Sequence, residues 1–139
     1  DINPKIKIEV FDMFFDENTN VDVKPDFVID AIDTVSSKIA LYKWCENNNI
    51  PFVSSMGAAR KTDLTKIKIG KISKTTVCPL ASKIRHIVRD LKIKDFPVVY
   101  STEVATPQPN GGREFGSMIT VTGTFGLMLA DFVIKKLIS

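Results

Sequence analysis

The stretch that decides the fold is Asp26–Lys38, DFVIDAIDTVSSK, where an apolar strand pattern leads directly into a helical pattern. Asp33 stands at the junction of the two. Ligands of open parallel sheets bind outside the carboxyl ends of the strands, so this carboxylate predicts a nucleotide site, with Asp30 as a second candidate. A carboxylate before a helix is also typical of a helix cap, and the spacing by itself favours capping. Both interpretations stay open at this point.

The segments around this junction predict a parallel crossover. Phe27–Ile32 is largely apolar, as in a strand covered on both faces. Thr34–Asn49 has apolar residues at helical spacing and ends in asparagines, and Pro51–Met56 reads as the next strand. A strand, a helix and a strand in so few residues indicate parallel pairing. The next four residues, from Gly57 to Arg60, form a Gly-Ala-Ala-Arg turn, where small residues let the backbone approach a ligand.

The rest of the chain predicts further strands and helices of a mostly parallel, Rossmann-like α/β sheet. Period-two alternation predicts strands at Lys5–Phe11 and Thr65–Ile72. One apolar stripe predicts a helix at Pro79–Ile93, and Phe96–Thr102 is the next strand, with Pro97 favouring an edge position or a strand start.

The C-terminal part predicts a loop and then a long helix. Glu103–Gly116, with PQPNGG at its centre, has loop composition, and the final helix is expected from about Ser117 to Ile138. Gly123 and Gly126 inside this helix predict a tightly packed neighbour. The apolar window within it is shorter than the roughly 20 residues of a membrane span and contains Asp131. A buried helix is therefore expected, with a membrane anchor as the alternative.

Composition places the chain among ordinary cytoplasmic domains. It has 139 residues, 44% of them hydrophobic and 25% charged, which suits one domain spanning residues 1–139. Cys45 and Cys78 are too few for a disulfide scaffold or a four-thiolate zinc site, so a reducing compartment is expected. The chain opens with the polar DINPK and shows no secretory signal.

Charge is unevenly distributed along the chain. Residues 1–33 hold nine acidic and three basic residues, whereas residues 60–94 hold eleven basic residues against two acidic ones. A basic stretch of this kind can neutralise phosphates and predicts RNA binding, with Lys83, Arg85 and Arg89 as candidate contacts. A solvated, lysine-rich face is the commoner explanation of such a stretch, and both interpretations stay open.

The ordered segments of the chain resemble a known superfamily. The matching stretches are NPKIKIEV, DFVIDAIDTVSSKIALYKWC, NIPFVSSMGAARKTDLTKIKIGKISKT, PLASKIRHIVRDL, VVYSTE and FGSMITVTGTFG. They look like the second half of the ubiquitin-activating-enzyme-like (ThiF/MoeB/HesA) ATP-binding domain. Within it, the DAID, IP, GA, PLA, STE and TGTFG positions are most similar to the tRNA threonylcarbamoyladenosine dehydratase branch.

The resemblance implies ATP-dependent adenylation of a carboxylate. In the dehydratase branch that carboxylate belongs to a modified adenosine in tRNA, which cyclises with loss of water. Asp33 matches the family's aspartate of the magnesium-ATP site, and Mg²⁺ prefers oxygen ligands that it shares with phosphates. Asp30, Gly57 and Arg60 are further candidates for contacts to ATP. The resemblance also implies a homodimer, with tRNA as a partner.

The departures from the family pattern concern the phosphate-binding half of the domain. No G-x-G-x-x-G loop is present, and the family's first βαβ unit lies upstream of the matched residues. We therefore expect an incomplete domain that is inactive alone, with its N-terminal half as partner. A split or degenerate homologue is the alternative. The relatives also carry a longer segment around GGREF.

The remaining reactive side chains give weaker indications. The sequence lacks the zinc-binding cysteine pairs of relatives that activate sulfur-carrier proteins, which disfavours a function of that kind. Cys78 matches the segment where ubiquitin-activating relatives carry a catalytic cysteine, although a helix-flanking role is favoured. Cys45 beside Trp44 reads as core. His86 is open as a general base or as a surface or RNA-facing residue.

Three functions remain open from the sequence. The first is the C-terminal half of a tRNA-modifying, ATP-dependent dehydratase. The second is an activating enzyme for a ubiquitin-like or sulfur-carrier protein, which would use Cys78. The third is a non-catalytic interaction subunit.

Overall fold

A four-stranded sheet forms the centre of the computed structural model, which describes residues 2–106 and 116–139. The strand order is β1-β2-β4-β3, with β1 and β4 parallel to β2 and β3 antiparallel to β4. The strands are β1 (Val28–Asp30), β2 (Phe52–Ser55), β3 (Ile67–Lys71) and β4 (Pro97–Ser101). This confirms the expected mostly parallel α/β fold.

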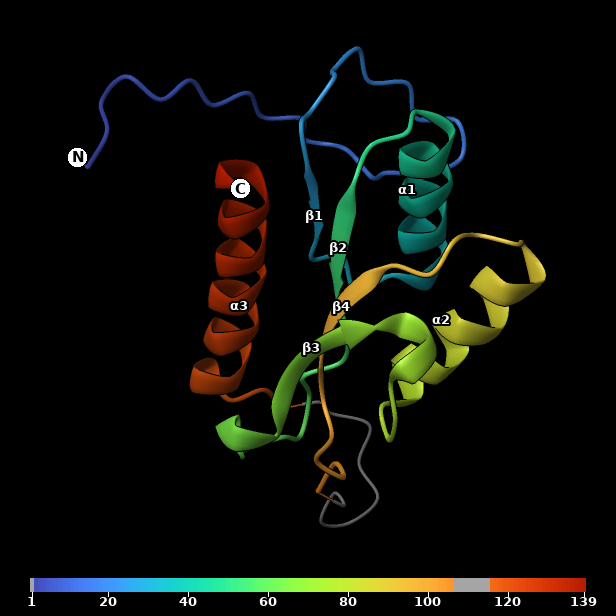
Figure 1. The fold of residues 1–139 in the computed structure, drawn as a ribbon, viewed down its shortest axis with the longest axis vertical. Coiled ribbons are helices and arrows are strands. Elements are labelled where there is room, and N and C mark those ends of the chain that lie inside the picture. The colour runs from blue at the N-terminus through green and yellow to red at the C-terminus, as the bar shows by residue number, and fades with distance from the viewer. Residues whose placement is uncertain (1, 107–115) are drawn as a thin grey trace.

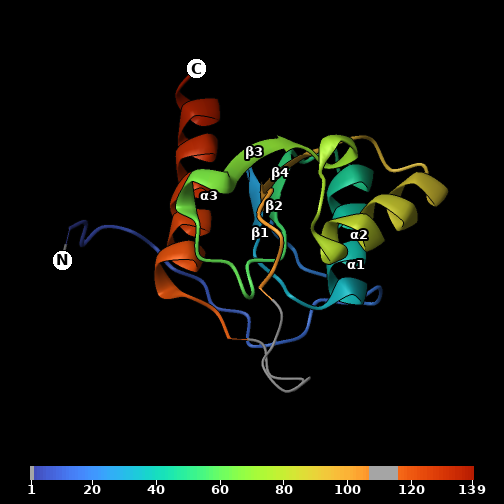
Figure 2. The same cartoon turned by 90° about the horizontal axis from the view of Figure 1, so that it is seen from below.

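Three helices cover the sheet and make a three-layered domain. They are α1 (Val35–Asn47), α2 (Pro79–Asp90) and α3 (Ile119–Ile138), with short 3₁₀ turns η1 (Leu64–Lys66) and η2 (Ile72–Lys74). Helices α1 and α2 lie on one face and α3 lies alone on the other (Figures 1 and 2). The strand expected to be covered on both faces, Phe27–Ile32, forms as β1 but leaves Ile29 45% exposed. Strand β4 is covered on both faces, because its neighbouring residues Val98 and Val99 are both fully buried, one in the core on each face.

Most predicted elements form within a few residues of their expected ends. Pro79 is in the first turn of α2, where a missing N–H costs nothing. Pro97 begins β4, which lies between β2 and β3, so the strand-start interpretation is confirmed and the edge interpretation is wrong.

The strand predicted at Lys5–Phe11 does not form. The segment is irregular, and the side chains of Ile6 and Ile8 are 64% and 76% exposed. In Figure 1 it runs as an extended tail away from the sheet. A strand needs a neighbour to satisfy its backbone groups, and no described strand lies beside this segment.

Helix α3 differs from the expected buried helix. One stripe faces the sheet, whereas Ile119, Leu127 and Ile134 are largely exposed. No described residue of this chain supplies the tight packing predicted at Gly123 and Gly126, since a Cβ added to either has nothing within 4 Å among them. In the described ranges, no helix combines the length and apolarity needed to cross a bilayer. Residues 107–115, which hold both PQPNGG and GGREF, lie outside the described residues.

Candidate functional site

Asp33 lies at the carboxyl end of β1, in the turn that leads into α1. Its side chain is exposed, and its carboxylate accepts one hydrogen bond, from Thr34 Oγ1 at 3.2 Å. Thr34 is the N-cap residue of α1, and no side chain caps that helix end. The capping interpretation of Asp33 is therefore wrong. The carboxylate faces solvent at the edge of the sheet where α/β folds bind ligands.

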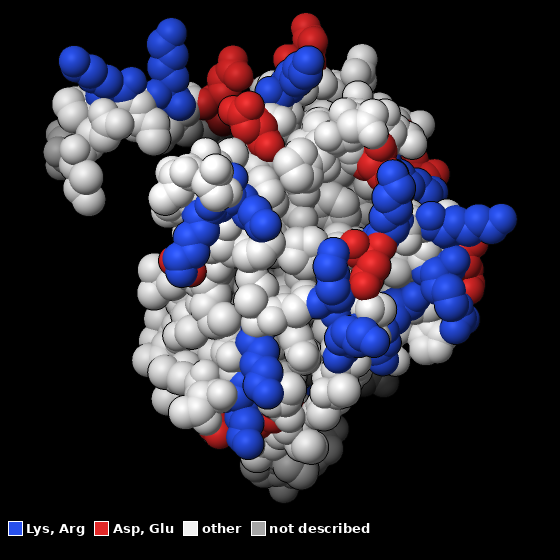
Figure 3. All heavy atoms as spheres, viewed as in Figure 1, with Lys and Arg blue, Asp and Glu red and all other residues white. Residues whose placement is uncertain are grey.

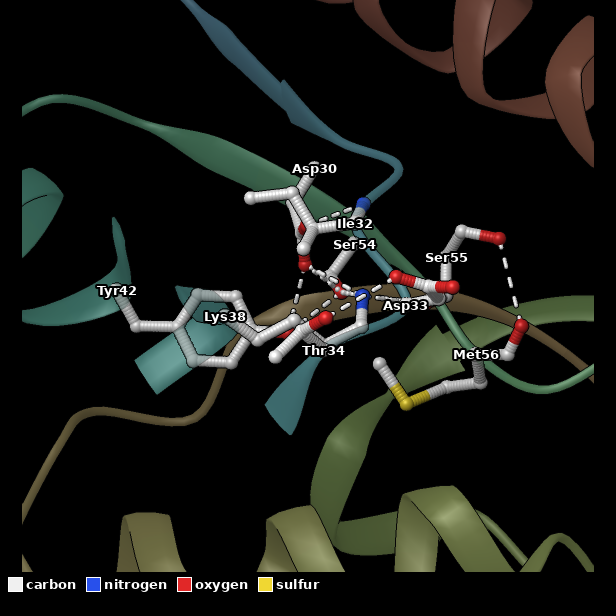
Figure 4. Close-up of polar contacts among 9 residues, drawn as sticks. All are labelled: Asp30, Ile32, Asp33, Thr34, Lys38, Tyr42, Ser54, Ser55 and Met56. Atoms are coloured by element: carbon white, nitrogen blue, oxygen red, sulfur yellow. Dashed lines mark hydrogen bonds and ion pairs between the residues drawn. The ribbon is translucent and has the colours of Figure 1, made fainter. Parts of the chain in front are cut away.

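Asp30, three residues earlier, is fully buried and has a different role. Its Oδ2 accepts hydrogen bonds from Lys38 Nζ and Tyr42 OH, both at 2.8 Å, and from Ser54 Oγ. Its Oδ1 accepts from Ile32 N at 2.9 Å, which holds the turn before Asp33. Figure 4 shows these side chains converging on one carboxylate. Asp30 has no exposed surface with which to contact ATP, so it acts by positioning the turn.

Lys38 joins three elements through this buried network. It lies on α1, pairs with Asp30 on β1, and donates to the carbonyl of Ser55 on β2 at 2.8 Å. Burial lowers the pKa of Lys38, while the carboxylates of Asp30 and then Asp33 act to raise it. Burial also raises the pKa of Tyr42, so its hydroxyl stays protonated and keeps donating. The network fixes the carboxyl ends of β1 and β2 relative to α1.

Gly57 and Arg60 belong to the turn that follows β2. A Cβ added to Gly57 would lie 3.3 Å from Cys78 Sγ, so the glycine allows close packing against the start of α2. Arg60 adopts a left-handed conformation with φ of 58°. Its Nη1 donates to the carbonyl of Thr106 at 3.5 Å, and its N–H donates to the carbonyl of Gly116 at 3.0 Å. The two predicted residues thus lie in one turn at the same sheet edge as Asp33.

The sequence did not reveal a clamp between Lys61 and the segment after β4. Lys61 is buried, and its ammonium donates to the carbonyls of Ser101 at 3.2 Å and Glu103 at 2.9 Å. The Glu103 carboxylate in return accepts from the N–H groups of Thr62 and Asp63, each at 3.0 Å. The STE motif was visible as a resemblance, but no periodicity or spacing links its glutamate to a lysine 42 residues earlier.

The two cysteines are both buried. Cys45 lies in the core, and burial raises the pKa of its thiol to about 12, which confirms the interpretation as a core residue. Cys78 is 2% exposed, is the N-cap residue of α2, and accepts a hydrogen bond from Ala81 N at 3.5 Å. A helix-flanking position is confirmed, and the thiol has little surface from which to attack a substrate.

The basic candidates on α2 differ in their surroundings. Lys83 and Arg89 are exposed. Arg85 is half-buried and donates to the Thr75 carbonyl at 2.9 Å and to the Thr75 hydroxyl. His86 is exposed, and its Nδ1 donates to the carbonyl of Ser82 at 2.7 Å. Lys83 and Arg89 are therefore exposed enough to contact a phosphate, as predicted. Arg85 instead holds the segment before α2.

The donor set suits a metal ion that is shared with a phosphate. Within residues 2–106 and 116–139, no three His, Cys, Asp or Glu side chains gather into a metal cage. Mg²⁺ is commonly held by one or two carboxylates together with phosphate oxygens and water. The solvent-facing carboxylate of Asp33 fits that arrangement.

The open sheet, the carboxylate at its carboxyl edge and the buried network behind it define an α/β domain of the Rossmann-like class. The chain belongs to the ThiF family, whose family model matches residues 1–139.

Individual relatives agree with this assignment. The chain is 44% identical over 107 residues to the tRNA threonylcarbamoyladenosine dehydratase of Bacillus subtilis, covering 74% of this chain and 42% of the relative. It is 33% identical to the dehydratase of Haemophilus influenzae, covering 99% of this chain and 61% of the relative. The crystal structure of Escherichia coli TcdA in complex with ATP superimposes with a TM-score of 0.85 at 34% identity, covering 99% of this chain and 59% of that one. The chain thus spans about 60% or less of the length of these relatives.

Proposed function

We propose that this chain is the C-terminal part of an ATP-dependent enzyme that adenylates a carboxylate, in the dehydration of threonylcarbamoyladenosine in tRNA. The observation that carries the proposal is the exposed Asp33 carboxylate on a turn fixed by Asp30, at the carboxyl edge of the sheet. The dehydratases among the relatives, and the ATP complex of one of them, support it.

The residues of this chain would serve the reaction mainly through position and charge. ATP supplies the adenylyl group that makes the carboxyl group of the substrate reactive. Asp33 would hold Mg²⁺ against the phosphates, where the metal neutralises charge. The turn at Gly57–Arg60 lies at the same edge, and the Arg60 guanidinium is suited to a phosphate. Preorganised groups of this kind need no rearrangement during the reaction.

We further propose that an N-terminal half of the domain completes the site and the sheet. Strand β1 is at the edge of the sheet, and Ile29 on it is 45% exposed. Lys5–Phe11 alternates like a strand but has no neighbour. Strands from the other half would pair with both and would bring the phosphate-binding loop to Asp33. Without that half, this chain is expected to be inactive.

The same proposal includes tRNA and a second copy of the chain as partners. Lys83 and Arg89 on the exposed side of α2 would contact the phosphate backbone of tRNA. The exposed apolar residues of α3, including Leu127 and Ile134, would give a homodimer a surface to bury. The burial of Cys78 disfavours an activating enzyme that passes its substrate to a thiol.

Pyrophosphate release by the complete protein tests the proposed function. With tRNA that carries threonylcarbamoyladenosine, Asp33→Asn should reduce turnover by about 100-fold or more, because the metal loses its protein ligand. Asp131→Asn is the control, since Asp131 is also exposed but lies on α3, where it pairs with Lys135. Turnover within twofold of the parent for Asp33→Asn would contradict the proposal. Release driven by a carrier protein instead of tRNA would favour the activating-enzyme alternative, and no release with either would favour an interaction subunit.

A further inference from the structure

A cavity lies at the edge of the sheet opposite Asp33. It has a volume of about 640 Å³ and opens where the parallel strands begin. Its lining includes Phe27 just before β1, Pro51 just before β2, and Phe96 just before β4. Figure 3 shows an uncharged hollow in the upper part of the molecule with basic side chains on both sides. The volume is in the range of about 300–1,000 Å³ that is typical of small-molecule sites.

Four phenylalanine rings form the walls of this cavity. Phe27 packs edge-on against Phe132 of α3, with ring centroids 6.2 Å apart. Phe52 and Phe96 lie 4.7 Å apart, centroid to centroid, and both also contact the ring of Tyr42. These contacts fix the rings, so the cavity offers rigid apolar walls to a flat or branched apolar group.

The charged side chains at the opening give a net positive charge, because three lysines (Lys71, Lys94 and Lys136) line the cavity against two carboxylates (Glu46 and Asp95). The carboxylates that line the cavity are already engaged with this chain. Asp95 accepts from Ser73 N at 3.1 Å and Ser73 Oγ at 2.7 Å, and Glu46 accepts from the backbone N–H of Lys94 at 3.3 Å.

The lysines at the opening are less engaged than the carboxylates. Lys71 Nζ donates to the carbonyl of Asp95 at 3.2 Å. The ammonium of Lys94 has no acceptor in the described part of the chain, and that of Lys136 lies 5.9 Å from the centre of the Phe132 ring. Two cationic groups are thus available beside an apolar cavity, which favours an apolar ligand with a negative group.

We infer that this cavity binds an apolar organic anion, with an aromatic or aliphatic body and a carboxylate, sulfonate or phosphate group. The body lies against Phe27, Phe52 and Phe132, and the anionic group meets Lys94 and Lys136. The site is separate from Asp33, because the two lie at opposite ends of the strands. Its ligand therefore binds whether or not the site at the other edge supports the adenylation of a substrate by ATP.

The test uses two fluorescent probes of similar shape. The aromatic sulfonate 8-anilinonaphthalene-1-sulfonate carries the anion, and N-phenyl-1-naphthylamine lacks it. Titration of the purified protein should give one saturable site per chain for the sulfonate. The double variant Lys94→Glu/Lys136→Glu should weaken sulfonate binding about tenfold or more, because two attractive charge pairs become repulsive. Binding of the neutral probe should stay within twofold.

A matched pair of charge reversals separates a local site from the overall charge. Lys66→Glu/Lys74→Glu changes the net charge equally on exposed lysines that do not line the cavity, and it should leave sulfonate binding within twofold. Equal weakening of sulfonate binding by both double variants would overturn the inference, and so would non-saturable binding. Binding of neither probe would overturn it as well, because another part of the protein would then fill the cavity. Ile69→Trp, which fills the cavity from β3, should weaken both probes, and unchanged binding would also contradict the site. Urea denaturation of each variant confirms that it is folded.

Discussion

The tetrapeptide Lys-Ile-Lys-Ile occurs twice in this chain, and only one copy forms a strand. Residues 5–8 are irregular and exposed, whereas residues 67–69 of the second copy begin β3. Ile67 is 8% exposed, in contrast to 64% for Ile6. Local propensity is identical for the two copies, so the difference arises from their surroundings.

The neighbouring strand decides between the two outcomes. Five residues of β3 pair with five residues of β4, from Ile67 opposite Ser101 to Lys71 opposite Pro97. Ile67 also packs into the core that α3 covers. No described strand offers such pairing to residues 5–8. An alternating pattern therefore reports that a segment can become a strand, and the available partner determines whether it does.

The largest effect on stability is expected at Asp30, which is fully buried and forms an ion pair with Lys38. Asp30→Ala should lower the free energy of unfolding by about 3–5 kcal/mol, because it leaves the Lys38 ammonium buried without its counter-charge. Urea denaturation measures this loss. Asp33→Asn, at an exposed carboxylate of the same turn, should stay within about 0.5 kcal/mol. Similar values for the two variants would show that the buried network does not hold β1, β2 and α1 together.

A second experiment compares the two copies of the tetrapeptide directly. Ile67→Ala should destabilise the protein by about 2–4 kcal/mol, since it removes buried methyl groups from a packed core. Ile6→Ala changes the same residue type in the same local sequence and should stay within about 0.5 kcal/mol. A large loss at Ile6 would mean that the N-terminal segment packs against something in solution, as expected if the other half of the domain pairs with it.

Much of the fold could be predicted because its signals are local. The helical spacing of Thr34–Asn49 and the proline at the start of α2 are visible within a few residues. The same holds for Asp33, which lies in the short turn between a strand and a helix. The resemblance extended this information, since its ordered motifs placed the strands in one sheet.

The features that could not be predicted depend on long-range contacts. Lys38 reads as one polar position in a helix, yet the fold buries it beside Asp30 and Ser54. Lys61 and Glu103 form their clamp only because β4 ends next to the turn after β2. The cavity at the opposite edge is likewise assembled from residues that precede three different strands. Sequence periodicity carries no information about contacts between residues that are far apart in the chain.

The clamp gives a smaller effect with a distinct pH dependence. Hydrogen bonds from the backbone N–H groups of Asp63 and Thr62 hold the pKa of Glu103 below its ordinary value of 4.5. This stabilisation is fully present above pH 4.5 and is lost as the pH falls through the lowered pKa. Glu103→Gln should therefore cost about 1 kcal/mol at pH 7, a value discounted for the solvent exposure of the carboxylate.

Chemical denaturation at two pH values checks the role of Glu103. The stability difference between Glu103→Gln and the parent should shrink from pH 7 to pH 3, because the unfolded parent gains a proton near the ordinary pKa before the folded one does. Asp90→Asn is the control, since its carboxylate is exposed and, among the residues that the structure describes, pairs only with the neighbouring Arg89. A difference that stays constant with pH would mean that the charge of Glu103 does not contribute to the clamp.

The smallest effect on stability is expected on the exposed face of α3. Gly123→Ala should raise the free energy of unfolding by about 0.5–1 kcal/mol, because alanine is the better helix former and its Cβ would meet open space. Ala130→Gly in the same helix should lower it by a similar amount. Thermal denaturation and analytical ultracentrifugation should be measured together. If Gly123→Ala instead destabilises the protein and weakens self-association, a second copy packs closely on this face of α3. The exposed face of α3 would then resemble residues 5–8, whose strand pattern also has no packing partner within the described chain.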